Sequence, residues 1–134
     1  MRSIIFPVLL FFLPVFAFSQ QRQYFTTNSS AIKYFALANQ SLDENLYDDA
    51  VGQLKKAIEA DDKFVEAHFV LGDVYRLMKQ HQPAVEQYLK VLNINPDFNR
   101  SVYLKIGDEE ISIAHYDDAQ HHLEKYLTYP DISH

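Results

Sequence analysis

The sequence contains no cysteine and no tryptophan, and only three glycines and five prolines among its 134 residues. Without cysteine there can be no disulfides, cysteine-ligated zinc, iron–sulfur clusters or thiol catalysis. Few glycines and prolines disfavour a fold with many β-turns, whereas the common Leu, Ala, Lys, Glu and Gln favour helices. Lys and Arg number 12 against 18 Asp and Glu, so clustered positive charge for phosphates is scarce. We expect no binding to nucleic acid.

The first 19 residues differ from the rest of the chain. Arg2 precedes an apolar run over residues 4–18, which ends at the small residues Ala17 and Ser19. This layout is typical of a secretory signal peptide, with cleavage before Gln20. An uncleaved anchor is the alternative, but the run is shorter than the roughly 20 apolar residues that span a bilayer. We therefore expect an exported protein with no membrane span after cleavage.

Apolar residues recur at helical intervals from Ala31 almost to the end of the chain. Steps of three and four residues place them on one face of each helix. A polar lead-in over 20–29 precedes them, with Ser29 or Ser30 as the expected helix cap, and a short tail covers 130–134. The predicted helices are 30–43, 47–60, 64–78, 82–93, 99–113 and 117–128. Short connections make consecutive helices antiparallel.

Small residues recur with a period of 34 residues, then 35, so that one residue is inserted after Pro96. They are Ala38, Gly72 and Gly107 in the first helix of each pair, and Ala50, Ala84 and Ala119 in the second. We predict that the two helices of each pair cross at these positions, where a larger side chain would hold the axes apart. Added volume at such a contact costs about 1–3 kcal/mol. Accidental spacing in an ordinary helical bundle is the alternative.

The middle unit carries a fuller pattern, which resembles the tetratricopeptide repeat. Its landmarks are Leu71, Gly72, Tyr75, Ala84, Tyr88 and Pro96. The first unit has Ser41 and the third has Glu110 where the tyrosine is usual. The resemblance implies an all-α fold, a right-handed superhelical stack of three helix-turn-helix units over about 31–64, 65–98 and 100–130.

Residues 24–75 also resemble the start of a group of exported bacterial envelope proteins. These combine tetratricopeptide repeats with a PD40 β-propeller and an OmpA-like peptidoglycan-binding domain, and some are linked to type IX secretion and gliding. The resemblance implies a non-catalytic protein-interaction scaffold, periplasmic or outer-membrane associated. Its implied partners are other envelope proteins or downstream domains of the same polypeptide. No propeller or OmpA-like residues occur in this sequence. Peptidoglycan binding is therefore assigned to no position.

In the repeat family, positions 2, 5, 9 and 12 of each first helix line a concave groove. In this sequence Ser101 stands at the second position of the third unit. The groove residues that the resemblance assigns are the other eleven, namely Ile32, Phe35, Asn39, Leu42, Glu66, Phe69, Asp73, Arg76, Leu104, Asp108 and Ile111. Several are apolar, which predicts a contact surface for a protein. The alternative is that the lead-in or a following domain covers it. Arg76 is the one basic residue in this set, which disfavours an acidic C-terminal peptide as the ligand.

Histidines and paired aspartates support a second hypothesis, a small exported metal-binding protein or enzyme. His115, His121 and His122 lie close in sequence, but His121 and His122 point about 100° apart on a helix, and we interpret them as solvated. The Asp pairs at 48–49, 61–62 and 117–118 fall at predicted helix ends, where Asp is favoured electrostatically. His68, at the repeat's tryptophan position, is expected to pack. We predict no catalytic residue, no metal site and no cofactor.

The last predicted helix carries a group of large apolar residues near the end of the chain. They are Leu123, Tyr126, Leu127 and Tyr129. Stacked repeats need a polar outer face or an added helix at each end. We therefore expect that the chain is the front part of a longer protein, or that a partner covers this end. The alternative is that these residues turn inward against the first helix of the third unit, which would bury Leu123 and Tyr126 more easily than the others.

Overall fold

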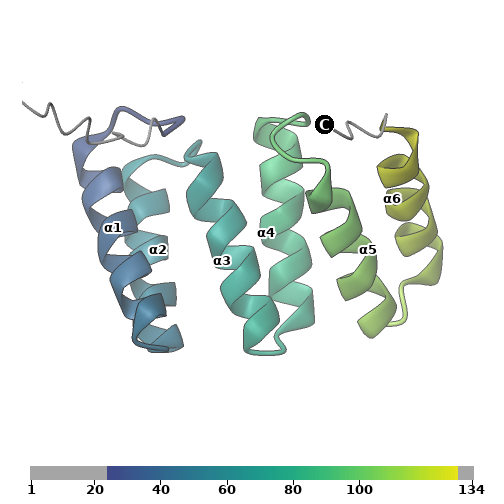
Figure 1. Ribbon diagram of the computed structural model, residues 1–134, viewed down its shortest axis with the longest axis horizontal. Coiled ribbons are helices and arrows are strands. Elements are labelled where there is room, and N and C mark those ends of the chain that lie inside the picture. The colour runs from purple at the N-terminus through teal and green to yellow at the C-terminus, as the bar shows by residue number, and fades with distance from the viewer. Residues whose placement is uncertain (1–23, 130–134) are drawn as a thin grey trace, which may run out of the picture.

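The computed structural model describes residues 24–129 as six α-helices, which lie side by side in a row from α1 to α6 (Figure 1). They are α1 (Ser29–Asp43), α2 (Tyr47–Ala60), α3 (Val65–Leu77), α4 (His81–Ile94), α5 (Ser101–Ser112) and α6 (Tyr116–Thr128). Every predicted helix is confirmed, with ends shifted by two residues at most. The predicted signal peptide and tail lie outside the described residues. Within 24–129, no helix has the length and apolar character needed to cross a membrane.

The first helix is capped one residue earlier than predicted. Asn28 is the N-cap, and its Oδ1 accepts hydrogen bonds from the backbone N–H groups of Ser30 at 3.0 Å and Ala31 at 3.1 Å. Its Nδ2 also donates to the carbonyl of Ala60 at 2.8 Å. The prediction of Ser29 or Ser30 was wrong because the asparagine can cap α1 and bind the end of α2 at once.

The turn inside each helix pair has the same backbone geometry three times. One residue in each turn has a positive φ, and these are Asn45 at 59°, Lys79 at 58° and Ala114 at 61°. The N–H of the following residue donates at 2.8 Å to a carbonyl in the last turn of the preceding helix; the pairs are Leu46–Ser41, Gln80–Tyr75 and His115–Glu110. The turns therefore recur at the same 34- and 35-residue intervals as the small residues.

The small residues lie where the paired helices cross. A Cβ atom added to Gly72 would lie 2.6 Å from Cε1 of Tyr88 on α4, and one added to Gly107 would lie 2.6 Å from Cγ of Leu123 on α6. The four alanines of the predicted set are buried, and they are Ala38, Ala50, Ala84 and Ala119. The predicted crossing positions are confirmed.

Two adjoining hydrophobic clusters join the three units into one stack. The first lies among α1, α2 and α3 and includes Phe35, Leu54 and Phe64. The second lies among α3, α4 and α5, where Tyr88 and Ile106 are fully buried. Because α3 contributes to both clusters, the first and third units are held through the second.

The last helix leaves less apolar surface in water than the sequence suggests. Leu127 is 77% exposed, but Leu123, Tyr126 and Tyr129 are each partly buried. The ring of Tyr129 packs on that of Tyr103, with centroids 5.7 Å apart. The expectation of a broad apolar end is therefore wrong for three of its four residues, which turn toward the third unit itself.

Candidate protein-interaction surface

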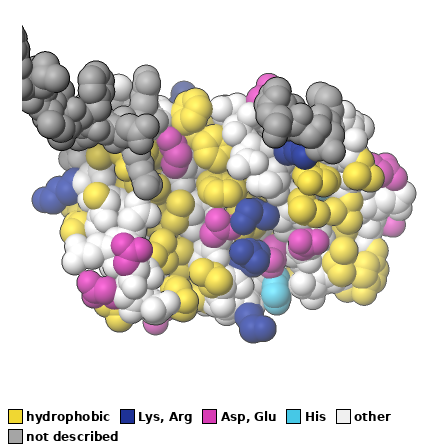
Figure 2. Space-filling model, in the orientation of Figure 1, with side chains coloured by type: hydrophobic (Ala, Val, Ile, Leu, Met, Phe, Trp, Pro, Cys, Tyr) yellow, Lys and Arg dark blue, Asp and Glu magenta, His cyan; other side chains and the backbone are white. Residues whose placement is uncertain are grey.

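The predicted groove residues lie on the first helices of the three pairs, and we call their shared surface the α1/α3/α5 face. Figure 2 shows hydrophobic side chains on this side of the molecule around a central group of basic and acidic ones. Arg76, Asp108 and Ile111 are exposed. Partial burial is the rule for the rest of the predicted set, namely Ile32, Asn39, Leu42, Glu66, Phe69, Asp73 and Leu104, and Phe35 is buried. Ligand binding by these residues stays a prediction.

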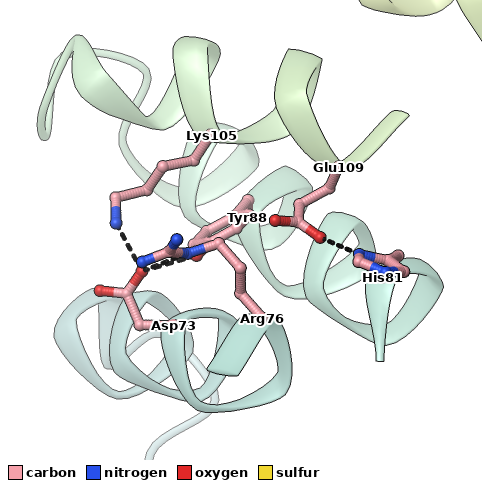
Figure 3. A network of polar contacts seen from close by, with 6 residues as sticks. All are labelled: Asp73, Arg76, His81, Tyr88, Lys105 and Glu109. Atoms are coloured by element: carbon pink, nitrogen blue, oxygen red, sulfur yellow. Dashed lines mark hydrogen bonds and ion pairs between the residues drawn. The ribbon is translucent and has the colours of Figure 1, made fainter. Parts of the chain in front are cut away.

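The centre of the face is a polar network around the Asp73 carboxylate (Figure 3). Its Oδ1 accepts hydrogen bonds of 2.6 Å from the Tyr88 hydroxyl and from Nζ of Lys105. Nε of Arg76, one helical turn along α3, lies 3.9 Å from the same oxygen. Burial, followed by the hydrogen bond to Asp73, raises the pKa of Tyr88 above its ordinary value. Tyr88 therefore stays protonated as a donor.

Lys105 is a residue of this surface that the sequence reasoning missed. It follows Leu104 by one position, and its long side chain reaches from α5 to Asp73 on α3. Its Nζ also lies 5.2 Å from the ring centroid of Phe69 and 5.9 Å from that of Tyr88. The face therefore presents two basic groups, and the view that Arg76 stands alone was wrong. Both groups are already directed at one carboxylate.

Phe35 differs from the other predicted face residues, because it belongs to the hydrophobic core with 5% of its surface exposed. The ring of Tyr24, from the lead-in, packs edge-on against Phe35 at 5.4 Å and against Phe64 at 5.8 Å. Phe35 is thus covered by the segment before α1. At this position the structure agrees with the alternative in which the lead-in covers part of the surface.

Residues 24–28, which we call the lead-in strap, are bound along the start of α3 and the end of α2. The backbone N–H of Phe25 donates to Oε1 of Glu66 at 2.9 Å. The hydroxyl of Thr26 donates to the Asp61 carboxylate. The Phe25 ring lies 5.8 Å from that of Phe98. The strap, which has no regular secondary structure, therefore docks on this end of the face through both main-chain and aromatic contacts.

Residues 65–98 match the family model described as tetratricopeptide repeat. The described residues form an all-α stack of helix-turn-helix units with a fold like that of tetratricopeptide-repeat structures. A crystal structure of MamA superposes with a TM-score of 0.70 at 29% identity, and the match covers 75% of this chain and 58% of that one. The second TPR of Spaghetti (RPAP3), solved bound to the HSP90 peptide SRMEEVD, gives a TM-score of 0.68 at 15% identity, covering 75% and 92%. A comparison with functionally curated proteins finds no significant match.

The third helix-turn-helix unit contains two buried carboxylates, each paired with a histidine. Glu109 bonds through Oε2 to Nδ1 of His81 at 2.6 Å, and Glu110 bonds through Oε2 to Nδ1 of His122 at 2.8 Å. The interpretation of His122 as a solvated histidine was wrong, because it joins α6 to α5 through Glu110. His68 is buried as predicted, between Gln87 and the carbonyl of Asp62.

The paired aspartates lie at helix ends, as predicted. The pairs at 48–49 and 117–118 lie in the first turns of α2 and α6, where the helix dipole favours negative charge. Asp61 caps the end of α2 and accepts from the N–H of Lys63 at 3.0 Å. Among residues 24–129, no three His, Asp or Glu side chains are grouped so as to hold a metal ion.

Proposed function

We propose that this protein is a non-catalytic scaffold that binds a segment of a protein partner on its α1/α3/α5 face. The observation that carries the proposal is the centre of that face. There, two basic groups, Lys105 and Arg76, converge on the single carboxylate of Asp73. Partly exposed Leu104 and exposed Ile111 belong to the same face. Tetratricopeptide repeats generally serve protein interaction, and the Spaghetti repeats were solved with a bound peptide.

The charges of the network suggest the chemistry of the bound segment. Asp73 neutralises one of the two basic groups, so a ligand carboxylate can pair with the other. The aliphatic residues of α5 offer apolar contact beside it, and Asp108 disfavours a second negative charge near that end. A partner segment with one acidic residue next to an apolar one fits this arrangement. A long acidic stretch does not.

We further propose that the scaffold is exported and acts in the cell envelope, as the N-terminal module of an OmpA-like assembly or secretion-associated protein. The apolar leader and the resemblance of residues 24–75 to such modules support this proposal. N-terminal sequencing of the protein from envelope fractions should begin at Gln20. An intact Met1 terminus on protein found only in the cytoplasm contradicts export.

Site-specific photocrosslinking in the native cell tests the binding face. A benzophenone amino acid at Leu104 should capture a defined partner, whereas the same probe at Leu89, exposed on α4, should not. The purified partner should then bind the wild-type chain and lose affinity at least tenfold for Arg76→Ala combined with Leu104→Asp. Equal capture from both probe positions, or unchanged affinity in a folded double variant, would refute the assignment of the face.

A further inference from the structure

We propose that the lead-in strap is an intramolecular ligand of the α1/α3/α5 face, which a protein partner must displace to occupy the first two repeats. The inference rests on the proposed function in one respect, namely that a partner binds this face. Docking of the strap itself is testable without any partner. In the structure, residues 24–28 of the same chain already occupy this end of the face.

Two features of the contact are those of peptide recognition. The Glu66 carboxylate accepts the backbone N–H of Phe25, a main-chain contact that does not depend on the side chain at that position. The ring of Tyr24 packs against Phe35 and Phe64, and edge-to-face packing of this kind is favourable beyond the area it buries. The face thus binds an aromatic side chain, that of Tyr24, and the backbone N–H of the next residue, Phe25.

Other features indicate that the strap can be exchanged. Residues 24–28 form no helix or strand, and Phe25 is 68% exposed although its ring contacts Phe98. Oε2 of Glu66 is buried and has no hydrogen-bond partner among the described residues. A buried acceptor without a donor is costly. The strap therefore supplies a hydrogen bond to Oε1 of this carboxylate but none to Oε2. A partner segment with a second donor can bind both oxygens.

Competition by the strap lowers the apparent affinity for any external ligand. When a site is open for only a fraction of the time, its apparent affinity equals the intrinsic affinity multiplied by that fraction. If the strap is docked about nine-tenths of the time, an external segment binds about tenfold more weakly than it does to a permanently open face. The favoured partner segment has no helix or strand of its own, carries an aromatic residue at the Tyr24 position and offers several backbone or side-chain donors.

The test uses a fluorescent peptide with the sequence of residues 21–28 and protein expressed from the full-length coding sequence. In Tyr24→Ser combined with Phe25→Ser, the face is vacated, and the peptide should bind at least about tenfold more tightly than to the wild type. A peptide with serine at both aromatic positions is the control and should bind neither protein. Absence of peptide binding to a folded double variant, or equal affinity for both proteins, overturns the proposal.

A second variant decides the question if the serine substitutions prevent folding. The chain has no cysteine, and the side chains of Thr26 and Asp61 are in contact. Thr26→Cys with Asp61→Cys therefore offers one disulfide that locks the strap in place and keeps both aromatic residues. The oxidised protein should bind the peptide several-fold more weakly than the same protein after reduction. Identical peptide binding before and after reduction overturns the proposal. The partner captured by crosslinking should likewise bind the oxidised protein more weakly than the reduced protein; equal partner binding to both would refute displacement by the partner and would leave the strap's docking intact.

Discussion

The second and third repeats have the same backbone geometry but different interiors. Both cross their helices at a buried glycine, and both close their turn with a residue of positive φ. Two positions after the glycine, however, the second repeat has buried Val74, whereas the third has buried Glu109 and, next to it, Glu110. The backbone of a repeat thus depends on small residues at the crossing. It accepts carboxylates inside the unit when a neighbouring helix supplies histidines.

The comparison also accounts for where the family resemblance is strongest. The matching segment, 65–98, is the second repeat. Tyr75 is present there, while the third repeat has Glu110 at the equivalent position and the first has Ser41. A family pattern scores the residue type at each position. A buried carboxylate such as Glu110 therefore weakens the match to the pattern even though the backbone keeps the same geometry.

The largest expected effect is at the glycine of the second crossing. Gly72→Leu should lower the free energy of unfolding by about 3 kcal/mol, because overpacking forces the helices apart. Tyr88 cannot yield easily, since it is fully buried and bonded to Asp73. Thermal unfolding should show a drop of more than about 10 °C. An unchanged melting temperature would mean that the crossing is misassigned.

Two other glycines provide matched controls for this substitution. Gly107→Leu meets the partly exposed Leu123 on α6, which has room to move, so we expect a smaller loss than for Gly72→Leu. A Cβ atom added to Gly52 meets nothing within 4 Å. Gly52→Ala on α2 should therefore stabilise the helix by about 0.5–1 kcal/mol.

An intermediate effect is expected where the two repeats differ most. His122→Ala should lower the free energy of unfolding by about 2–3 kcal/mol, because the carboxylate of Glu110, 3% exposed, loses its hydrogen-bond partner and is left buried. The equivalent substitution in the second repeat, Gln87→Ala, breaks a bond to His68 and should cost about 1 kcal/mol. Denaturant unfolding measures both values.

A double-mutant cycle separates the charge from the packing at His122. In a Glu110→Gln background the buried charge is absent, so His122→Ala should cost only about 1 kcal/mol. An equal loss in both backgrounds would show that His122 acts through its contacts with the Tyr103 ring rather than through the carboxylate.

The smallest effect concerns the feature that the repeats share. Ala114 has a φ of 61°, a conformation that costs a residue with a Cβ roughly 1–2 kcal/mol. Ala114→Gly should therefore raise the free energy of unfolding by about 1 kcal/mol. Asn45→Gly at the equivalent turn should gain less, because asparagine tolerates this region. A loss of stability in Ala114→Gly, measured by denaturant unfolding, would contradict this account of the turn.

The fold was predictable from the sequence because its signals are local and periodic. The spacing of Gly72 and Ala84 indicates a helix crossing, and the intervals between apolar residues indicate the helices. The conformations of Lys79 and Ala114 were not predictable in the same way, since neither residue type favours positive φ. The repetition of the turn would have identified those positions only after the repeat had been aligned.

The candidate surface was predictable in position and less so in composition. The face residues follow from their positions in each first helix of the repeat. Lys105 is not at one of those positions and reaches the face only because its side chain is long, which a count of positions does not reveal. Phe35 is buried because Tyr24, outside the repeat pattern, folds over it. His122 was misjudged because its partner Glu110 lies on another helix. Contacts between different segments depend on side chains that no single-helix pattern contains.

The order in which the helices pack has a kinetic consequence. The most extensive helix contacts join elements that are neighbours in sequence, from α1 with α2 to α5 with α6. Chains dominated by such local contacts fold quickly, within microseconds to milliseconds. The bond between Phe25 and Glu66 spans 41 residues, so the strap can dock only after α3 has formed against α1 and α2. We expect the strap to dock after α1, α2 and α3 have packed together during folding, and to be among the first segments to detach on unfolding.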